Sequence, residues 1–514
     1  MNGCSRPLVR ERRNAMADKA TIVLFSHVSN TRSITGAEKL LLFFAQELSP
    51  YFNCILVAPQ DGKLTSQARS CGISVQLLSI PLLYGMYTPY AGLEADAQKF
   101  QESREYHELT DWLNSLRPAF VITSTCVHAL PAMAAKSLGI PVIWKISETI
   151  TDNEYTPISV GLIHRNSDEI LAISQTAAAC FPEDVRAEKV IQLPPSWNDK
   201  EMMIEAWSKL RSERRRELRV KPHEQLIGYI SSFINKEKGL EHFVKMAVLV
   251  HAVHPSSKFV VIGSAGDKSY YERCVRKVKL EGLYTRFKFV GYAECLPSAY
   301  CAMDVLVVPS LIREGFGMTA LEGMAFGKPV IAYDSGGLRE ILHAAGCGEN
   351  LVPASDISAL AERVNVMLAQ PGLALTLGSQ ARERVDAVYG PAAYRSRLQG
   401  LAEMWNLRYC SAPAVREADS VVVVEPPAVQ PDLPAASPFA AAKQGPAEPR
   451  RPQAARQSPR AGEAGARWFC AALLASGVKV LPGGAAPPGA SAAGPAAVDG
   501  GARRKCLDCS EAAS

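Results

Sequence analysis

Short apolar runs alternate with segments of helical periodicity along most of this chain. The apolar runs have the length and the β-branched bias of buried parallel strands. They predict strands at residues 21–26, 54–59, 73–78, 119–124, 141–146, 169–174, 189–193, 225–231, 259–263, 287–291, 304–310 and 330–333. Between them, apolar residues recur at helical spacing, which predicts helices at residues 37–48, 105–116, 128–138, 175–180, 240–250, 318–326, 365–368, 375–384 and after residue 337.

This alternation of strand and helix is typical of a doubly wound α/β fold. The chain has 514 residues, enough for two ordinary domains and additional segments. We place the domains at residues 21–204 and 205–390. Residues 1–20 are polar and basic and predict a flexible leader, because the apolar core of a signal peptide is missing. Residues 410–514 are rich in Ala, Pro, Gly and Arg and predict a low-complexity disordered tail.

Two segments depart from this alternation. Residues 81–102 have no clear period, and we interpret them as a loop over the ligand cleft. Residues 205–219 are strongly charged and include the run Arg214-Arg215-Arg216. Such a run is typical of a solvated helix face, and peripheral contact with a membrane surface is the less favoured alternative.

Composition narrows the class of protein. The chain is 47% hydrophobic and 21% charged, which is typical of a globular protein, and its formal charge of +5 gives no reason to expect nucleic acid as a partner. The 13 cysteines are scattered, mostly in apolar stretches, which indicates reduced thiols in a cytoplasmic protein. Cys506 and Cys509 have CxxC spacing but no second ligand pair, so we do not expect a metal site there. No apolar run is long enough to span a membrane.

Residues 304–340 carry the candidate chemistry. Each of the two predicted strands in this stretch is followed by a glycine-rich loop and then a helix, and helix N-termini favour anions. The first loop contains Glu314, and the helix after it contains Glu322. Amides bind phosphate, and carboxylates accept hydrogen bonds from the hydroxyls of a diol. The pattern therefore predicts a ligand that has both phosphates and sugar hydroxyls.

The stretch EGFGMTALEGMAFGKPVIAYDSGGLREIL, with Glu314-x7-Glu322, resembles the nucleotide-sugar signature of retaining glycosyltransferases with the GT-B fold, the large group 1 family or family 4. The resemblance extends more weakly from about residue 21 to residue 408. It implies two Rossmann-like domains that face each other across a cleft, with a helix at residues 391–409 that crosses back to the first domain. It also implies transfer of a sugar from a nucleotide-diphosphate sugar to an acceptor hydroxyl on a glycan, a lipid or a small molecule. The resemblance implies no cofactor and no obligatory metal.

The resemblance also assigns roles to residues of this sequence. Glu322 would accept the ribose hydroxyls, and Glu314 would accept hydroxyls of the transferred sugar. Lys238 would neutralise the leaving diphosphate. The other donor-binding positions that it implies are the backbone at Phe316 and Gly317, the helix start at Met318 and Thr319, Gly36 in the loop Thr35-Gly36-Ala37-Glu38, Gly263 in a Gly-x-Gly-like turn, and Tyr292 and Leu296 near the base.

The sequence departs from the family pattern at three places. Phe233 stands where relatives carry an arginine, and Arg313 is our candidate for the replacement cation. Glu148 lies in the loop where many relatives have a histidine that approaches the reacting sugar, so we treat it as a candidate catalytic residue. His27 and His128 follow other strands and are alternatives for that role. The turn at residues 194–198 contains Pro195-Ser196 in place of Asn-Gly, which alters the interdomain region.

Two further functions stay open. One is a glycosyltransferase-like binding protein without turnover, which the departures at Phe233 and Glu148 favour. The other is a sugar-nucleotide epimerase on the same fold. Base, sugar and acceptor are not read from the sequence, and the cytoplasm, or the inner face of a membrane at its periphery, is the expected location.

Overall fold

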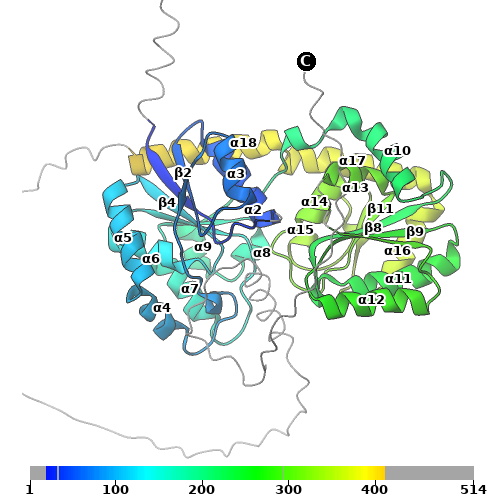
Figure 1. Ribbon diagram of the computed structural model, residues 1–514, viewed down its shortest axis with the longest axis horizontal. Coiled ribbons are helices and arrows are strands. Elements are labelled where there is room, and N and C mark those ends of the chain that lie inside the picture. Colours follow the sequence, from blue (N-terminus) through cyan, green and yellow to red (C-terminus); the bar gives the residue numbers. More distant parts are fainter. Residues whose placement is uncertain (1–18, 32–33, 292, 294, 411–514) are drawn as a thin grey trace, which may run out of the picture. The chain divides into compact units, whose positions relative to one another are not determined.

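The computed structural model describes residues 19–31, 34–291, 293 and 295–410. They form two parallel sheets with helices on both faces, each the core of one lobe (Figure 1). The predicted fold class, two Rossmann-like doubly wound domains, is confirmed. The predicted leader, apart from its last two residues, and the predicted tail, apart from Cys410, lie outside the described residues.

The first lobe is built on a seven-stranded parallel sheet of order β3-β2-β1-β4-β5-β6-β7. In the register, Ile22 of β1 lies opposite Cys54 of β2 and Phe120 of β4. The strands are β1 (Thr21–Phe25), β2 (Asn53–Ala58), β3 (Ser74–Leu77), β4 (Phe120–Ser124), β5 (Val142–Ile146), β6 (Glu169–Ala172) and β7 (Val190–Gln192). The helices are α2 (Gly36–Leu48), α3 (Lys63–Ser70), α4 (Leu93–Gln101), α5 (Arg104–Leu116), α6 (Ala129–Ser137), α7 (Thr156–Arg165), α8 (Gln175–Ala178) and α9 (Glu183–Lys189).

The second lobe is built on a six-stranded parallel sheet of order β10-β9-β8-β11-β12-β13. The strands are β8 (Leu226–Ile234), β9 (Lys258–Ala265), β10 (Phe287–Val290), β11 (Val305–Val308), β12 (Val330–Tyr333) and β13 (Leu351–Val352). The helices are α10 (Trp207–Glu217), α11 (Leu240–Val253), α12 (Lys268–Leu280), α13 (Leu296–Ala302), α14 (Met318–Ala325), α15 (Gly337–Ala344), α16 (Ile357–Ala369) and α17 (Pro371–Tyr389). The predicted strand–loop–helix repeat at residues 304–340 is therefore present as β11, α14, β12 and α15.

Each sheet is buried between two helical layers, which explains its apolar strands. In the second lobe, α11, α12 and α16 cover one face, and α13 and α14 lie on the other (Figure 1). In the first lobe, α2 and α3 pack on the face that presents Ile22, Leu24 and Phe120. Strands buried on both faces read as continuous apolar runs rather than as an alternation of apolar and polar residues.

The last long helix, α18 (Pro391–Trp405), packs on the first lobe. Trp405 Nε1 donates to Glu169 Oε2 over 2.7 Å, and Arg395 pairs with Glu47 of α2 at 2.9 Å. Tyr394 lies against Phe43 with ring centroids 5.2 Å apart. The chain thus returns from the second lobe to the first through α18.

The prediction of a loop at residues 81–102 was wrong. This segment contains a short 3₁₀ turn, η1 (Tyr84–Met86), and the helix α4. Leu93, Ala97 and Phe100 are buried at helical spacing within α4. Glycine, proline and tyrosine residues before Leu93 concealed this short periodic stretch.

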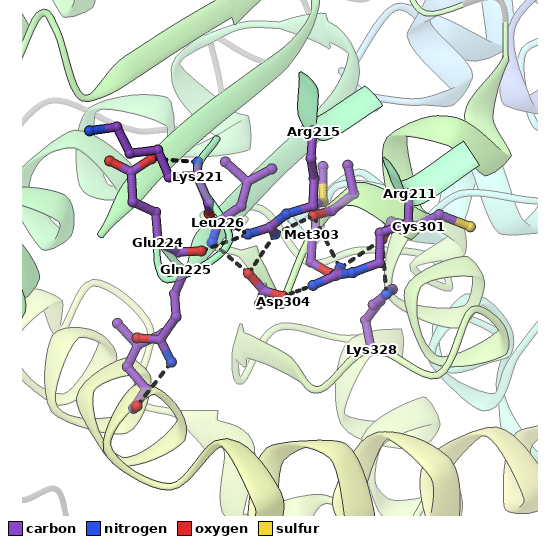
Figure 2. Close-up of polar contacts among 12 residues, drawn as sticks. Arg211, Arg215, Lys221, Glu224, Gln225, Leu226, Cys301, Met303, Asp304 and Lys328 are labelled. Atoms are coloured by element: carbon purple, nitrogen blue, oxygen red, sulfur yellow. Dashed lines mark hydrogen bonds and ion pairs between the residues drawn. The ribbon is translucent and has the colours of Figure 1, made fainter. Parts of the chain in front are cut away.

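The basic run at residues 205–219 is only in part a solvated face. It forms α10, and Arg211 and Arg215 both point at Asp304, the residue before β11 (Figure 2). Arg211 Nη2 lies 2.5 Å from Asp304 Oδ1, and Arg215 Nη1 lies 2.9 Å from Asp304 Oδ2. Arg211 also donates to the carbonyls of Cys301, Ala302 and Met303 at the end of α13. These two arginines are structural cations that join α10 to the second sheet.

We expect Asp304→Asn to lower the free energy of unfolding by about 2–4 kcal/mol, because it leaves Arg215 without its counter-ion at a mostly buried position. The side chain of Arg215 is only 11% exposed. Burial alone would raise the pKa of Asp304, but the two arginines and the Leu226 amide hold it below its usual value. The loss should therefore be full near pH 7 and shrink as the pH falls through the pKa that Asp304 has in the folded protein.

Urea unfolding at neutral and acid pH measures this effect. Glu108→Gln is the matched control, because it breaks an exposed pair with Arg104 and should change stability little. A loss in Asp304→Asn no larger than that of the control would show that the arginine contacts do not stabilise the fold.

Among the described residues, no helix combines the length and the apolar character that a membrane crossing needs.

Candidate functional site

The topology of each sheet predicts a ligand site at one of its edges. Both sheets reverse their winding direction between two central strands, β1 and β4 in the first and β8 and β11 in the second. In open α/β sheets, ligands bind beyond the carboxyl ends of the strands at this switch point. The loops there contain most of the residues that the sequence singled out.

The smaller of two cavities in this region has a volume of about 320 Å³ and is lined by residues of both lobes. It brings together the three predicted catalytic residues, Glu314, Lys238 and Glu148. Arg313 and Phe233 also line it. Its other polar lining residues are His27, Asn30, Thr35, Tyr87, Ser147, Thr149, Asn235 and Glu237.

Glu314 is held by two partners in this cavity. Lys238 Nζ lies 2.6 Å from Glu314 Oε1, and Ser310 Oγ donates to the same oxygen over 2.6 Å. Burial alone would raise the pKa of Glu314, but Lys238 and Ser310 outweigh it and hold that pKa below its usual value. Glu314 is therefore an ionised acceptor near neutral pH, and no donor from the described residues is bonded to its second oxygen.

Lys238 ends a tight turn after β8. Asn235 caps this turn by accepting from the Lys238 amide over 3.0 Å, and Gly239 follows in the left-handed region at φ 72°. Glu237, also on the cavity, has a raised pKa because it is partly buried and lies near Glu314. The site thus holds a lysine between two glutamates, of which only Glu314 pairs with it closely.

The start of α14 needs glycine for space and conformation. Gly317 has φ 110°, and a Cβ there would lie 2.6 Å from Leu338 Cδ2. The first amides of a helix have no partner within the helix, so the segment from Gly317 to Thr319 can bind an anion. The side chain of Phe316 is buried against Tyr389, so this residue offers the site only its backbone.

Glu148 is fixed by the loop that follows β4. Its Oε1 accepts from the Thr125 hydroxyl and the Cys126 amide, and its Oε2 accepts from the Ser147 amide over 3.0 Å. Sequence reasoning identified Glu148 from its place after β5 but did not anticipate these donors. They fix the Glu148 carboxylate as a hydrogen-bond acceptor at the wall of the smaller cavity.

The two histidine alternatives separate in the structure. His27 lines the smaller cavity, and burial lowers its pKa to about 4, against the opposing effect of Glu148. It is therefore neutral at pH 7. His128 is fully buried with its ring edge-on to Phe25, and neither ring nitrogen has a hydrogen-bond partner among the residues that the structure describes. Only His27 is placed to meet a ligand in the smaller cavity.

We expect His27→Gln to reduce the acid sensitivity of the fold. The folded pKa of His27 lies below its unfolded value, so the unfolded chain binds more protons between about pH 6.5 and 4. The stability is full above that range and falls as the pH drops through it. The variant should remove about 1–3 kcal/mol of the loss between pH 7.5 and pH 4.5, measured by urea unfolding. His223→Gln, at an exposed position, is the control, and equal pH dependence in both variants would contradict the expectation.

A larger cavity of about 730 Å³ adjoins the first. It is lined by Gly36, Leu296, Met318 and Glu322, all expected near the donor, and by Lys39 of α2. Tyr300 donates to Glu322 Oε2 over 2.6 Å. Burial raises the pKa of Glu322, and Tyr300 and Lys39 oppose this shift. Glu314 and Glu322 therefore serve two neighbouring cavities.

The loop between β1 and α2 is built around Glu38. This buried carboxylate accepts from the Asn30 amide over 2.9 Å, the Asn30 side chain over 2.8 Å and the Thr35 amide over 2.7 Å. Thr35 in turn caps α2 by accepting from the Glu38 amide over 3.3 Å. The loop resemblance at residues 35–38 thus has a local cause, a reciprocal capping box. It leaves Gly36 in open space at the helix start.

Gly263 and Tyr292 are the remaining residues that were predicted to bind the donor. Gly263 does not lie in a turn, because β9 continues to Ala265, and a Cβ there would approach Ser231 O to 1.9 Å. It lines neither of the two cavities. Tyr292 lies outside the described residues. Sequence reasoning missed Asn30, Asn235 and Lys39, although the capping position of Asn235 shortly before Gly239 could have suggested that residue.

Across the described residues, we find no cluster of three or more His, Cys, Asp or Glu side chains arranged to hold a metal ion.

Comparison with known proteins finds a family match in the second lobe. Residues 224–370 match the family model of the group 1 glycosyl transferases. Over 197 residues, the chain is 33% identical to a 2-deoxystreptamine N-acetyl-D-glucosaminyltransferase of Streptomyces fradiae. The aligned region covers 35% of this chain and 45% of that protein. It is 30% identical over 168 residues to the lipopolysaccharide core biosynthesis mannosyltransferase LpcC of Rhizobium leguminosarum, which covers 32% and 47%. The chain therefore spans less than half the length of these relatives.

The likeness to solved structures extends over both lobes. HepE of Anabaena, in complex with UDP and glucose, superposes with a TM-score of 0.62 at 19% identity, over 75% of this chain and 100% of HepE. WaaG, a glycosyltransferase of lipopolysaccharide biosynthesis, gives a TM-score of 0.54 at 13% identity, over 74% of this chain and 99% of WaaG. At this identity the likeness establishes the two-lobed fold. Residues 224–370 thus match the group 1 glycosyl transferases, the family that the stretch around Glu314-x7-Glu322 resembles.

Proposed function

We propose that this protein is a retaining glycosyltransferase of family 4 that moves a sugar from a nucleotide-diphosphate sugar to an acceptor hydroxyl. One observation carries the proposal. Glu314, a partly buried ionised carboxylate, lies 2.6 Å from the cation Lys238 in a cavity between the lobes, and the second signature carboxylate, Glu322, lines the adjoining cavity. A nucleotide sugar needs both an acceptor of sugar hydroxyls and a cation for its diphosphate.

The lining of the two cavities suggests how the donor lies. Thr35 and Gly315 line the smaller cavity, whereas their near neighbours Gly36 and Met318 line the larger one. The donor would place its transferred sugar in the smaller cavity beside Glu314 and its nucleoside in the larger cavity beside Glu322. Its diphosphate would lie between them, at the N-termini of α2 and α14, where two helix dipoles favour negative charge.

The chemistry assigned to these residues is stabilisation of a leaving group. As the anomeric bond breaks, negative charge grows on the diphosphate, and Lys238 with the two helix starts would stabilise it. Glu314 would hold the sugar hydroxyls, and Glu148 would accept a hydroxyl hydrogen bond from the sugar or the acceptor. Retention of the anomeric configuration and independence from metal are parts of the proposal that rest on the family resemblance. So does a cytoplasmic location, with peripheral contact at the inner membrane face as its variant.

The similar proteins suggest where to begin with substrates. Their names include an aminocyclitol acceptor and a lipopolysaccharide core, so acceptors vary widely among them. HepE was solved with UDP and glucose, which makes UDP-glucose a sensible first donor. The acceptor of this protein is best sought by mass spectrometry after incubation with a donor and a cell extract.

A donor panel tests the proposal. The purified full chain is incubated with UDP-, GDP- and ADP-sugars, with and without EDTA, and release of nucleoside diphosphate is followed. We expect release with at least one donor, no effect of EDTA, and, once an acceptor is found, a product with the anomeric configuration of the donor by NMR. Donor binding without release would favour the binding-protein alternative. A changed sugar still attached to its nucleotide would favour the epimerase.

The cation that replaces the missing arginine is a separate prediction. Arg313 lines the smaller cavity, its side chain is exposed, and among the described residues no carboxylate forms an ion pair with it. We expect Arg313→Ala to weaken donor binding or slow turnover about fivefold, an effect of roughly 1 kcal/mol for an exposed charge. Adding Phe233→Arg to this variant should recover part of the loss. If Arg313→Ala changes neither quantity, Lys39 in the larger cavity is the next candidate.

A further inference from the structure

The first lobe forms hydrogen bonds with the backbone on both sides of Glu314. Thr149 Oγ1 donates to the Arg313 carbonyl over 2.9 Å, and Ser174 Oγ donates to the Gly315 carbonyl over 2.5 Å. Thr149 lies in the loop after β5, and Ser174 lies in the loop after β6. The two carbonyls that receive these hydrogen bonds immediately precede and follow the residue assigned to the transferred sugar.

The first lobe also packs closely against Gly315. A Cβ at Gly315 would lie 2.7 Å from the Ser147 carbonyl oxygen and 3.1 Å from Glu148 Cα. Any side chain would therefore push the loop away from the first lobe. The backbone carbonyl of Glu314 itself accepts from the Gly337 amide over 2.8 Å, at the start of α15. The second lobe thus holds residue 314, and the first lobe holds residues 313 and 315.

Glu340 adds a third connection through α15. Its carboxylate accepts from the Gln175 amide over 3.0 Å, the Thr176 amide over 2.7 Å and the Thr176 hydroxyl, all at the start of α8. Ser174 caps the same helix by accepting from the Ala177 amide over 2.8 Å, and it is 1% exposed. Its hydroxyl hydrogen is therefore directed to Gly315, and Glu340 fixes the helix start that carries it.

We infer that Ser174, Thr149 and Glu340 are positioning residues that set Glu314 against the transferred sugar, an inference that rests on the proposed function. Ser174 and Glu340 line neither cavity, so they act on the reaction only through the loop at residues 313–315. A catalytic group must be held to a fraction of an ångström, and a small displacement lowers turnover more than it lowers binding of remote parts of the substrate. These hydrogen bonds form only when the two lobes contact each other at this loop. The sugar-binding carboxylate is therefore held in place only in that arrangement.

The experiment compares Glu340→Ala and Ser174→Ala with the parent full chain. We expect kcat with the active donor to fall about 5- to 20-fold, less than for loss of a catalytic group. In the proposed pose, UDP does not reach the smaller cavity, so its Kd should stay within about twofold of the parent value. Amide hydrogen exchange over residues 311–317 should become faster in both variants.

Matched variants distinguish positioning from general damage. Glu349→Ala removes an exposed partner of Arg363 elsewhere in the second lobe and should alter neither turnover nor exchange of the loop. Thr149→Val should lower kcat, and Thr149→Ser, which keeps the hydroxyl, should restore it. Thr110→Val, which removes a hydroxyl from α5, is the control for that pair.

The outcomes separate this inference from the proposed function. An active parent whose Glu340→Ala and Ser174→Ala variants keep full kcat would overturn the positioning role and leave the function intact. Equal losses in kcat and in UDP affinity would also overturn it, because they indicate general damage. A parent that transfers no sugar from any donor would overturn the proposed function, and the positioning role with it, whatever the exchange data show.

Discussion

Replacing Lys238 by methionine is expected to lower kcat by about 100- to 1,000-fold, the effect of removing one fixed donor from a developing anion. Lys238 is the cation closest to Glu314 and sits on a turn that Asn235 and Gly239 hold in shape. With Phe233 in place of the arginine that the family resemblance implies, Lys238 would carry a larger share of the diphosphate charge. Methionine keeps the length and the apolar part of the side chain, so the turn should persist.

The variant should also change the pH dependence of any remaining activity. Without Lys238, burial of Glu314 is opposed only by Ser310, so the pKa of Glu314 should rise. Activity that needs the ionised carboxylate is then lost at a higher pH than in the parent, and the acid limb of the kcat profile moves up.

Steady-state kinetics with the active donor from pH 5 to pH 9 measures both effects. Lys236→Met, at an exposed neighbouring position, is the control and should behave like the parent. If Lys238→Met keeps kcat within a few-fold of that control, the cation that stabilises the leaving group lies elsewhere in the cleft.

Much of the fold was predictable because its signals are local. The apolar run at residues 304–310 contains the strand β11, which is buried on both faces, and Gly317 marks the start of a helix at a φ that other residues avoid. The same reasoning gave most of the strands within a few residues. It failed where local signals are weak: α4 follows a stretch of glycine, proline and tyrosine residues, and α3, α7, α9, α12 and α13 were not predicted at all.

Arg211 and Arg215 show why charge patterns are ambiguous. In the sequence, a cluster of arginines is typical of a surface, because unpaired charges avoid burial. Their partner Asp304 lies about 90 residues away in the sequence and meets them from its position just before β11 (Figure 2). No periodicity near residue 211 carries that information. A charge pair distant in sequence needs the topology before it can be found.

In the candidate site, too, local features were predictable from the sequence and contacts between distant loops were not. The residues that cluster at Glu314 were predictable, since the carboxyl ends of parallel strands meet at one edge. The division into two cavities was not, because the two carboxylates are only eight residues apart and the signature places them in one site. Glu148 was identified from its place after a strand, but the three donors that fix its carboxylate come partly from another loop. Such contacts depend on side-chain packing between loops, which sequence spacing does not encode.

The two signature carboxylates should respond differently to the same substitution. Glu314→Gln keeps the size of the side chain and an oxygen that can accept from Ser310, but it removes the charge that pairs with Lys238. Loss of a charge-assisted hydrogen bond to a sugar hydroxyl is worth about 1.5–3 kcal/mol, which corresponds to a fall in kcat of about 10- to 150-fold. Lys238 loses its competing partner, so the affinity for bare nucleoside diphosphate should be kept or should rise.

Glu322→Gln is the matched contrast on the other cavity. Its partner is the neutral hydroxyl of Tyr300, and no cation of the described residues pairs with it as Lys238 does with Glu314. The affinity for nucleoside diphosphate should fall by the same 1.5–3 kcal/mol, about 10- to 150-fold in Kd, while kcat at saturating donor changes little. Titration calorimetry with UDP and initial rates with the active donor give the two quantities for both variants. A shared profile, with Kd and kcat altered alike in Glu314→Gln and Glu322→Gln, would mean that the two cavities do not divide the donor between sugar and nucleoside.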